Sequence, residues 1–435
     1  MVPAGSYWLI GGRVPGSLLP SPWANEWATR DGDDLITVHL HIREGHIAEV
    51  LTTLPIRNED PWVECHGGLI WPCFVDCHTH LDKGHIWPRQ GNPDGTFQSA
   101  IMAVDQDHRH WSEEDLYTRM QFALRCSYAH GTQAIRTHLD GDYADHRQSG
   151  WPGLTVFRHL QGEWASRIRL QAVSIVDFHS FLGPEGEFLA DQLTTVNGVL
   201  GAVLYADAQV PAVLERMLDL AQERGMDLDL HCDETGDPAS LTVRQVAEAV
   251  LRRDFRGRVV CGHCCSLSQL NPSTLAETLA LIREARMGII SLPMCNLYLQ
   301  DRVAGRTPRW RGITALHELA TQGIPVAVAS DNCRDPFYGY GDHDMAEVFR
   351  MAVRIGHLDR PYGAWPRTVT HTPAQLMGYP ELGLIRPGIP ADLVLFRGRN
   401  YSEWLSRSQH DRVVLRQGQA IDSTLPAYAE LDALF

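Results

Sequence analysis

An alternation of strand-like and helix-like segments between residues 69 and 331 most constrains what this chain can fold into. Apolar runs predict eight strands, namely Leu69–His78, Gln133–His138, Arg169–Val176, Gly198–Tyr205, Met226–His231, Arg258–His263, Met287–Leu292 and Val326–Asp331. Amphipathic stretches predict helices that include Glu113–Ala129, Val210–Arg224, Leu241–Arg252, Pro272–Ala285 and Gly312–Thr321. Eight alternations over roughly 270 residues match a (β/α)8 TIM-like barrel, which typically needs about 250 residues. The expected fold class is therefore α/β.

Both ends of the chain contain short β-like runs separated by Gly and Pro turns. These runs are Trp8–Ile10, Leu35–Ile42 and His46–Val50 near the N-terminus, and Gly388–Phe396 and Arg412–Arg416 near the C-terminus. We expect the two sets to pair in one small β-sandwich domain. Its expected parts are residues 1–66 and 376–435, with the barrel at 67–375.

The composition argues against several kinds of partner. A net charge of −15 disfavours nucleic acid and anionic membrane surfaces. The chain contains no apolar run of the about 18 residues that a membrane span needs. Its first residues lack the pattern of a signal peptide, and its ten cysteines show no paired spacing. We therefore expect thiols in a reducing, cytoplasmic setting, and we reject a zinc ribbon at Cys261–Cys265 because no second cysteine pair accompanies it.

Residues that can bind a metal ion stand at the carboxyl ends of the expected strands. These residues are His78 and His80 at the first strand, followed along the chain by His138, His231, His263 and Asp331. Residues i and i+2 of a strand share one face, so His78 and His80 can bind the same ion. Any one of these residues could be an ordinary strand-end polar group. Their recurrence favours a metal site, because barrel enzymes place their chemistry at these strand ends.

Lys83 is the only lysine in the chain. Codon bias explains the scarcity, but it does not explain why the one lysine follows His80 by three residues. A compact, strongly hydrated cation there would face the site in a way that arginine does not. A two-metal hydrolase bridged by a carbamylated lysine is excluded, since no mid-barrel strand carries a lysine.

Several motifs resemble the amidohydrolase superfamily and, within it, the bacterial cytosine deaminase group. The motifs are His78-Thr79-His80-Leu81-Asp82, Arg136-Thr137-His138, His231-Cys232-Asp233-Glu234, Asn296-Leu297-Tyr298-Leu299-Gln300, Arg311-Gly312-Ile313-Thr314 and Asp331-Asn332-Cys333-Arg334-Asp335-Pro336-Phe337-Tyr338. The resemblance implies that His78, His80, His231 and Asp331 bind one divalent ion. It also implies that Glu234 moves the proton and that His263 orients the water. The superfamily is often oligomeric, so a homo-oligomer is expected.

The chemistry of these residues agrees with that resemblance. Three imidazoles, one carboxylate and an open position form a catalytic rather than a structural site, and zinc, iron and manganese all fit it. Such an ion makes water acidic near neutral pH. Glu234 can then shuttle a proton to a ring nitrogen while Asp331 and His263 hold the nucleophile. The expected catalytic residues are therefore Glu234, His263 and Asp331.

The expected substrate pocket departs from the cytosine deaminase pattern at three positions. Asp177, or His179 in a shifted register, stands where the group has glutamine, Asn332 replaces an aspartate, and Phe337 replaces a tryptophan. With Leu81 and Lys83, these residues form the expected substrate contacts. A carboxylate only accepts hydrogen bonds, so we expect rings with an N–H on that side, such as isocytosine-like pyrimidines or aminotriazines, and poor activity on cytosine.

The favoured function is thus metal-dependent hydrolytic deamination of an amino-substituted heterocycle. A second enzyme in the same fold would remove an alkylamine from a triazine-like ring. A third possibility is a metal-binding barrel without catalytic activity, which the presence of every ligand and of Glu234 disfavours. Ammonia release over a panel of rings would separate the three.

Overall fold

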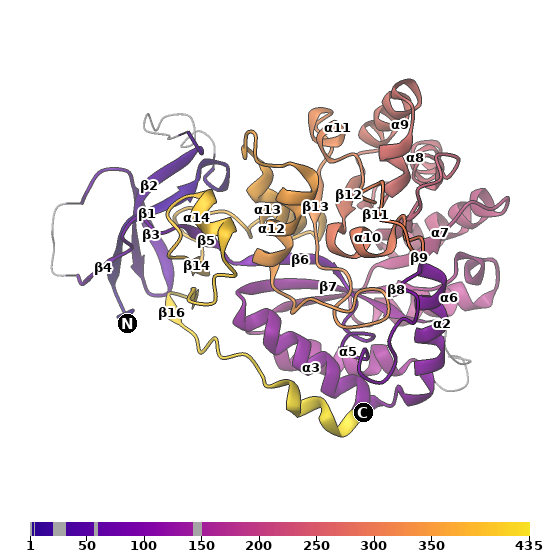
Figure 1. The fold of residues 1–435 in the computed structure, drawn as a ribbon, viewed down its shortest axis with the longest axis horizontal. Helices are drawn as coiled ribbons and strands as arrows, with labels where there is room; N and C mark the ends of the chain where they lie inside the picture. Colours follow the sequence, from indigo (N-terminus) through magenta and orange to yellow (C-terminus); the bar gives the residue numbers. More distant parts are fainter. Residues whose placement is uncertain (1, 4, 21–31, 56–59, 142–149) are drawn as a thin grey trace. The chain divides into compact units, whose positions relative to one another are not determined.

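The computed structural model describes residues 2–3, 5–20, 32–55, 60–141 and 150–435 (Figure 1). The chain divides into two compact units. One comprises Met1–Val75, Arg125–Ala134 and Asp344–Leu425, and the other comprises Asp76–Leu124, Ile135–His343 and Pro426–Phe435. The two domain boundaries expected from the sequence stay predictions. The contacts additionally group residues 125–134 and 344–375 with the two ends of the chain.

Eight strands form a closed barrel, which confirms the expected fold class. A first sheet has the order β6 (Phe74–Thr79), β7 (Thr132–Asp140) and β8 (Arg169–Ile175). A second, parallel sheet runs through β9 (Leu200–Leu204), β10 (Leu228–Cys232), β11 (Val259–His263), β12 (Gly288–Ser291) and β13 (Val326–Val328). Parallel bridges from Asp177 to Val203 and from Thr79 to Asp331 join the two sheets. The closure brings the carboxyl end of β6 beside the residues that follow β13.

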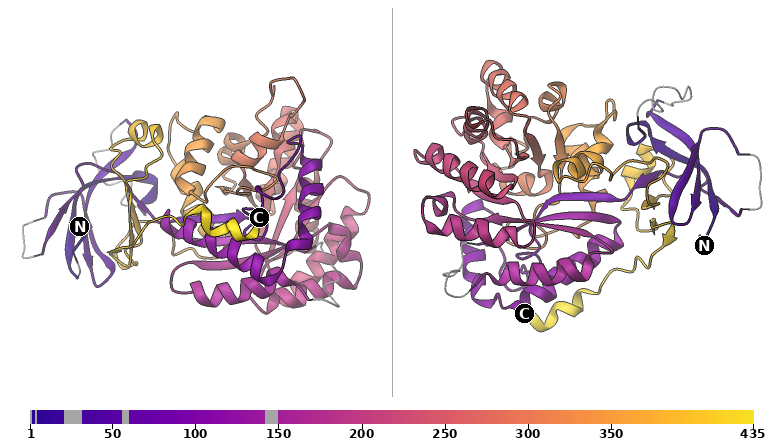
Figure 2. Two further views of the ribbon diagram at one scale, coloured as in Figure 1. Left: turned by 60° about the horizontal axis from the view of Figure 1, so that its bottom comes forward. Right: turned by 180° about the vertical axis from the view of Figure 1, so that it is seen from behind.

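Helices connect successive barrel strands. They are α2 (Phe97–Asp107), α3 (Glu113–Ala129), α5 (Pro152–Trp164), α6 (Pro184–Thr194), α7 (Val210–Arg224), α8 (Thr242–Arg253), α9 (Pro272–Glu284), α10 (Pro293–Leu299) and α11 (Leu316–Thr321). Helices α5 to α9 lie outside the strands (Figures 1 and 2). The expectation of a helix from Gly312 was wrong at its start, because Gly312 has a φ of +78° that a right-handed helix cannot contain.

The other unit contains two four-stranded sheets. One has the order β3 (His46–Leu51), β2 (Leu35–Arg43), β1 (Tyr7–Pro15) and β4 (Trp62–Glu64), and the other β16 (Gln419–Ala420), β15 (Val413–Arg416), β14 (Leu393–Leu395) and β5 (Ile70–Pro72). The same unit contains helices α12 (Met345–Gly356), α13 (His371–Leu376) and α14 (Tyr401–Ser406). Short 3₁₀ helices span Gly16–Leu18, His108–His110, Phe178–Leu182, Cys265–Gln269, Trp365–Val369 and Tyr428–Leu434.

The expected strand Leu69–His78 was wrong as a single element. Residues Ile70–Pro72 pair antiparallel with β14, and a new strand begins at Phe74. The backbone N–H of Cys73 donates to Asp392, whereas that of Phe74 donates to Gly131. The chain therefore passes from one sheet to another at Cys73. The sequence does not indicate this change, because the apolar run continues through it.

No helix in the described part of the chain is long and apolar enough to cross a membrane. All ten cysteines carry thiols rather than disulfides. The expected cytoplasmic location stays a prediction.

Candidate active site

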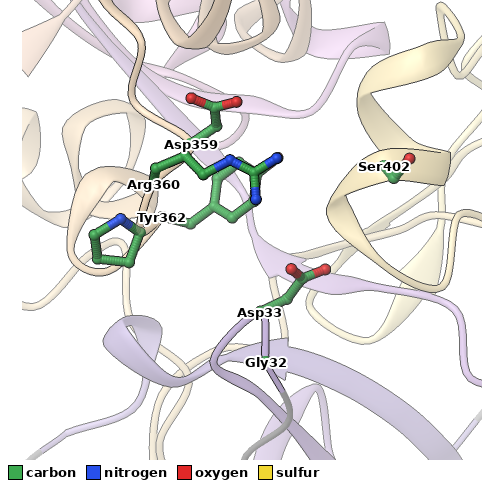
Figure 3. A pocket seen from close by; sticks show the side chains of 7 residues that line it. Gly32, Asp33, Asp359, Arg360, Tyr362 and Ser402 are labelled. Atoms are coloured by element: carbon green, nitrogen blue, oxygen red, sulfur yellow. The ribbon is translucent and has the colours of Figure 1, made fainter.

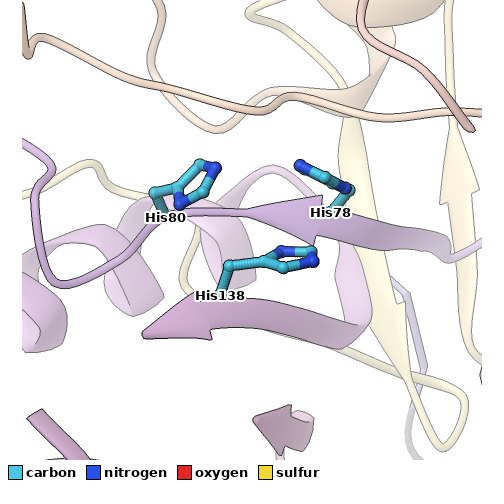
Figure 4. A group of neighbouring side chains, drawn as sticks. All are labelled: His78, His80 and His138. Atoms are coloured by element: carbon cyan, nitrogen blue, oxygen red, sulfur yellow. The ribbon is translucent and has the colours of Figure 1, made fainter. Parts of the chain in front are cut away.

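Five histidines come together at the carboxyl ends of the barrel strands. His78 on β6 lies with its ring centroid 3.9 Å from that of His138 and 4.6 Å from that of His231. The rings of His231 and His263 are 5.0 Å apart, and those of His80 and His138 are 5.4 Å apart. Figure 4 shows His78 and His80 on the same side of the chain, with His138 on the neighbouring strand β7. His80 directly follows β6, and the i, i+2 spacing still places it on the same side of the chain as His78.

Asp331 adds a carboxylate to this cluster. Its Oδ1 atom lies 3.2 Å from Nε2 of His80 and 3.6 Å from Nε2 of His78. Its backbone N–H donates to the carbonyl of His78. This hydrogen bond, which belongs to the closure of the barrel, holds Asp331 beside the histidines. Asp331 has a φ of +63°, a conformation that a non-glycine residue adopts at a cost of about 1–3 kcal/mol and that recurs at functional sites.

The electrostatics suit a metal ion. Burial and the neighbouring histidines hold the pKa of His78 and His231 well below the ordinary value, so both imidazoles are in the neutral, metal-binding form. Burial also raises the pKa of Asp331 to about 7. Both ring nitrogens of His78 and of His231 are buried without a hydrogen bond to any residue that the structure describes. Since buried polar atoms are normally satisfied, these residues fit a bound cation.

Glu234 and His263 lie beside the cluster and share one partner. Asn296 of α10 donates from Nδ2 to Oε1 of Glu234 at 3.2 Å and makes a 3.0 Å hydrogen bond with Nδ1 of His263. Burial and the nearby Asp331 raise the pKa of Glu234 well above its ordinary value. Burial and His138 lower the pKa of His263 to about 3. The raised proton affinity of Glu234 suits a group that takes up and returns a proton, and Nε2 of the neutral His263 makes no hydrogen bond to the described residues. Both groups can therefore act on the same bound molecule.

The sequence did not indicate the part played by His138, Asp229 and Arg136. Nε2 of His138 lies 3.3 Å from Oδ1 of Asp229, whose Oδ2 accepts a 2.7 Å hydrogen bond from Arg136. All three side chains are fully buried. A charged pair on two strands thus orients the histidine at the centre of the cluster. The sequence signals for this histidine were the motif Arg136-Thr137-His138 and its position at a strand end.

A cavity of about 380 Å³ opens onto the cluster. Its polar lining includes His80, His231, Glu234, His263 and Asp331, together with Lys83, Asp105, His108, Asp140, Asp177, Tyr205 and Asn332. Its apolar lining consists of Phe97, Ile101, Met102, Val104, Ile175, Val203 and Phe337. The cavity therefore combines ionisable and hydrogen-bonding groups with an apolar surface that can pack against a flat ring.

Most of the expected substrate contacts line this cavity. Lys83 lies with Nζ 3.5 Å from Oδ2 of Asp140 and 5.3 Å from the ring centre of Phe337. Burial lowers the pKa of Lys83, but Asp140 and Asp82 outweigh it and raise the pKa above its ordinary value, so the lysine is charged. Asn332 donates a 2.8 Å hydrogen bond to Asp335.

Asp177 lies at the half-exposed side of the cavity. Its Oδ1 accepts from the backbone N–H of His179 at 2.9 Å, and its Oδ2 accepts from Oη of Tyr205 at 2.7 Å. Burial raises its pKa, but these donors outweigh it and lower the pKa below its ordinary value. His179 and Leu81 are not among the described residues that line the cavity, and Leu81 is completely buried. The expected contact of Leu81 with the substrate stays a prediction.

A second cavity, of about 420 Å³, lies in the other unit (Figure 3). It is lined by Gly32, Asp33, Asp359, Arg360, Pro361, Tyr362 and Ser402. Its lining has no histidine or cysteine, so it lacks the donor set of the cluster. The chemistry belongs to the barrel cavity.

Comparisons with known proteins agree with the fold and with the class of enzyme. The amidohydrolase family model matches residues 94–419. A pterin deaminase from Rhizobium rhizogenes is 48% identical over 92% of both chains, and an N-isopropylammelide isopropyl amidohydrolase from a Pseudomonas species is 24% identical over 82% of this chain and 87% of its own. A solved structure of 5-methylcytosine deaminase from Klebsiella pneumoniae, liganded with 5-fluorocytosine, superimposes with a TM-score of 0.81 at 23% identity, covering 97% of this chain and 98% of that one.

The chain belongs to the amidohydrolase family. This family is metal-dependent, in agreement with the donor set described above. The expected class of enzyme, a hydrolytic deaminase of the amidohydrolase superfamily, is thereby confirmed.

Proposed function

We propose that the chain removes the amino group of a pterin or of a closely related ring built on isocytosine. The observation that carries this proposal is the pterin deaminase that is 48% identical over 92% of both chains. In support of it, His80, His231, Glu234, His263 and Asp331 line one cavity, and His78 belongs to the histidine cluster beside it. The chain would thus act on a small heterocycle, with neither nucleic acid nor membrane as a partner.

The cavity has features that suit such a ring. A pterin is an isocytosine ring fused to a pyrazine, so it is flat, apolar on both faces and polar along its edge. Phe97 and Phe337 meet edge to face, with ring centroids 5.6 Å apart, and offer an aromatic wall to its faces. The ionised carboxylate of Asp177 accepts hydrogen bonds, which suits an N–H or amino group on the ring edge better than the carbonyl of cytosine.

We propose His78, His80, His231 and Asp331 as the ligands of one divalent ion, zinc or iron, with manganese also acceptable to this donor set. When bound, such an ion lowers the pKa of a water molecule toward about 7. His138, held by Asp229, orients the neighbouring rings. The expected homo-oligomer stays a prediction.

Glu234 would carry the proton. It takes a proton from the attacking water and gives it to the ring nitrogen next to the carbon that bears the amino group. Asn296 steadies Oε1 of Glu234 and accounts for the tautomer of His263, because an amide N–H facing Nδ1 leaves the ring proton on Nε2. That Nε2–H then donates to the oxygen that adds to the ring. Glu234 then carries the remaining proton of the added hydroxyl group to the amine, so the C–N bond breaks, ammonia leaves and a carbonyl forms.

The first prediction is a substrate ranking. Two opposed acceptors cost about 1–3 kcal/mol when both are buried, and the half-exposed position of Asp177 puts the cost at the lower end of this range, about one decade in kcat/KM. We therefore expect pterin, and then isocytosine, to exceed cytosine by at least about tenfold. Replacing Asp177 with Gln should narrow this gap. Ammonia release and the change in ring absorbance measure kcat/KM for each ring, in the native protein and in Asp177→Gln.

Other outcomes identify the alternatives. Release of isopropylamine from N-isopropylammelide, with no turnover of pterin, would favour the triazine reaction that the 24%-identical relative suggests. A metal-loaded protein with no turnover on any ring would favour a non-catalytic barrel. If cytosine proved the best substrate and Asp177→Gln changed nothing, the pocket assignment would be wrong.

A further inference from the structure

A second cluster of metal-binding side chains lies in the barrel unit, separate from the residues that line the cavity. It consists of His85, Cys333 and His343. One ligand atom from each residue lies within 4.8 Å of the others, the same bound that holds within the central histidine cluster. His85 follows β6, Cys333 follows β13, and His343 precedes α12. The cluster thus draws together three segments that are far apart in the sequence.

The three side chains are removed from solvent. Their exposed fractions are 0% for His85, 1% for Cys333 and 3% for His343. Both ring nitrogens of His85 lack a hydrogen bond to any residue that the structure describes. An imidazole that is buried without hydrogen-bond partners costs free energy. The ring nitrogens of His85 therefore call for a partner other than the described residues. A bound cation would satisfy it.

The backbone fixes the positions of these side chains. The N–H of His85 donates to the carbonyl of Cys333 at 3.0 Å, and the N–H of Trp87 donates to that of Arg334 at 2.8 Å. These bonds join the loop after β6 to the loop after β13. The rings of His85 and His343 lie 5.6 Å apart, and Phe122 closes the other side of His85 with an edge contact at 4.9 Å. The ligands are therefore held before any ion arrives.

The neighbouring charges allow a cation. Burial, His343, Arg334 and Arg119 all lower the pKa of His85, which keeps the imidazole neutral. Arg119 already forms a salt bridge with Asp115 at 2.6 Å, and the guanidinium of Arg334 lies 4.4 Å from the ring centre of Tyr428. A Cys333 thiolate would offset part of the charge of a divalent ion.

We propose that His85, Cys333 and His343 bind a second divalent transition-metal ion, with zinc as the favoured ion. Two imidazoles and one thiolate are borderline-soft donors that prefer zinc over magnesium, calcium or manganese. In a tetrahedral site with bonds of about 2.0–2.3 Å, ligand atoms lie about 3.5 Å apart, so modest side-chain rotation within the observed 4.8 Å suffices. Binding deprotonates the thiol, and its proton passes to solvent.

The role of this ion is to hold the active-site loops. His85 lies two residues after Lys83, and Cys333 lies two residues after Asp331. Phe337, which lines the substrate cavity, belongs to the segment between Cys333 and His343. An ion bound by these three residues would hold Lys83, Asp331 and Phe337 in place, and the central site depends on all three. Because the ligands are buried, it would enter on folding and exchange slowly.

The test uses the intact chain and two independent measurements. Elemental analysis after dialysis should give two metal ions per chain in the native protein and one in Cys333→Ser and in His343→Gln. The cobalt-loaded native protein should show a thiolate-to-cobalt charge-transfer band in the near ultraviolet. The proposed catalytic ligands are all His or Asp, so only Cys333 can give that band. Cys126→Ser, which removes another buried cysteine, should retain both ions and the band.

Several results would overturn the proposal. One is a single ion per native chain with no thiolate band in its cobalt form. Others are a band that survives in Cys333→Ser and two ions that remain in His343→Gln. The measurements on the native protein decide the question even if a variant fails to fold. None of them depends on turnover, so they stand apart from the proposed substrate.

Discussion

At the scale of single residues, Glu234 carries the sharpest prediction. Replacing it with Gln keeps the size of the side chain and an oxygen that can face Asn296, but it removes the group that accepts and returns a proton. We expect kcat to fall by at least about 10²-fold, the usual contribution of a positioned acid–base group. Metal content, measured by elemental analysis, should not change, because Glu234 is not among the proposed ligands.

Glu223→Gln is the matched control for this substitution. Glu223 lies on the surface of α7, with 59% of its side chain exposed, and it forms an ion pair with the adjacent Arg224. Its replacement should leave kcat within twofold of native. Near-native turnover in Glu234→Gln would mean that another group, such as Asp331, moves the proton.

Much of this site could be predicted because its chemistry is local in sequence. His78 and His80 share a face through strand periodicity, and His231 and Asp331 stand at strand ends, where a barrel gathers its functional groups. The contacts of Asn296 with Glu234 and His263 could not be predicted, since they depend on where α10 crosses the barrel mouth. The same limit applies to His85 and His343, whose proximity appears only after the loops fold.

At the scale of elements, a buried ion pair joins the start of α12 to β15. Asp344 accepts hydrogen bonds from Nη1 of Arg412 at 2.7 Å and from the N–H of Ala346 at 3.0 Å, where it caps the helix. Burial raises the pKa of Asp344, but His130 and Arg412 outweigh it and lower the pKa to about 2. The carboxylate therefore stabilises the fold above the ordinary pKa of 3.8, and this contribution is lost as pH falls toward 2.

Asp344→Asn should lower the free energy of unfolding by about 3–5 kcal/mol at neutral pH, because it leaves Arg412 buried without its counter-charge. The difference between native and variant should shrink as the pH falls from about 4 to about 2, the window set by the lowered pKa. Urea unfolding at a series of pH values measures this. Asp191→Asn, at an exposed ion pair on α6, should leave the profile unchanged. A pH-independent difference would show that capping or packing, rather than charge, is lost.

Other elements show where sequence patterns fail. The helices Glu113–Ala129 and Val210–Arg224 were predicted to the residue, since their amphipathic pattern is decided locally. The division of Leu69–His78 into β5 and β6 was missed, because both strands are apolar and the partner β14 is distant in sequence. Periodicity reports which face is buried but does not report which sheet buries it.

At the scale of the whole molecule, barrel closure creates the site. The bridge between Thr79 and Asp331 joins the first strand to the last, and His80 and Asp331 meet only because of it. The count of alternations predicted the barrel, and the barrel predicted that strand-end residues converge. The alternation could not predict the shape of the cavity, because most of its apolar lining comes from α2 and from the loop that carries Phe337.

The final prediction concerns the loss of metal from the folded chain. An ion that binds the folded state alone adds RT ln(1 + [L]/Kd), about 2.7 kcal/mol at a free concentration one hundred times Kd. Removing it leaves the imidazoles of His78 and His231 buried with no hydrogen bond to the described residues. We therefore expect chelation to lower the melting temperature by several degrees and added zinc to restore it in a concentration-dependent way. The same titration on Cys333→Ser isolates the central cluster. A melting temperature unchanged by complete removal of metal would show that these histidines are satisfied without an ion.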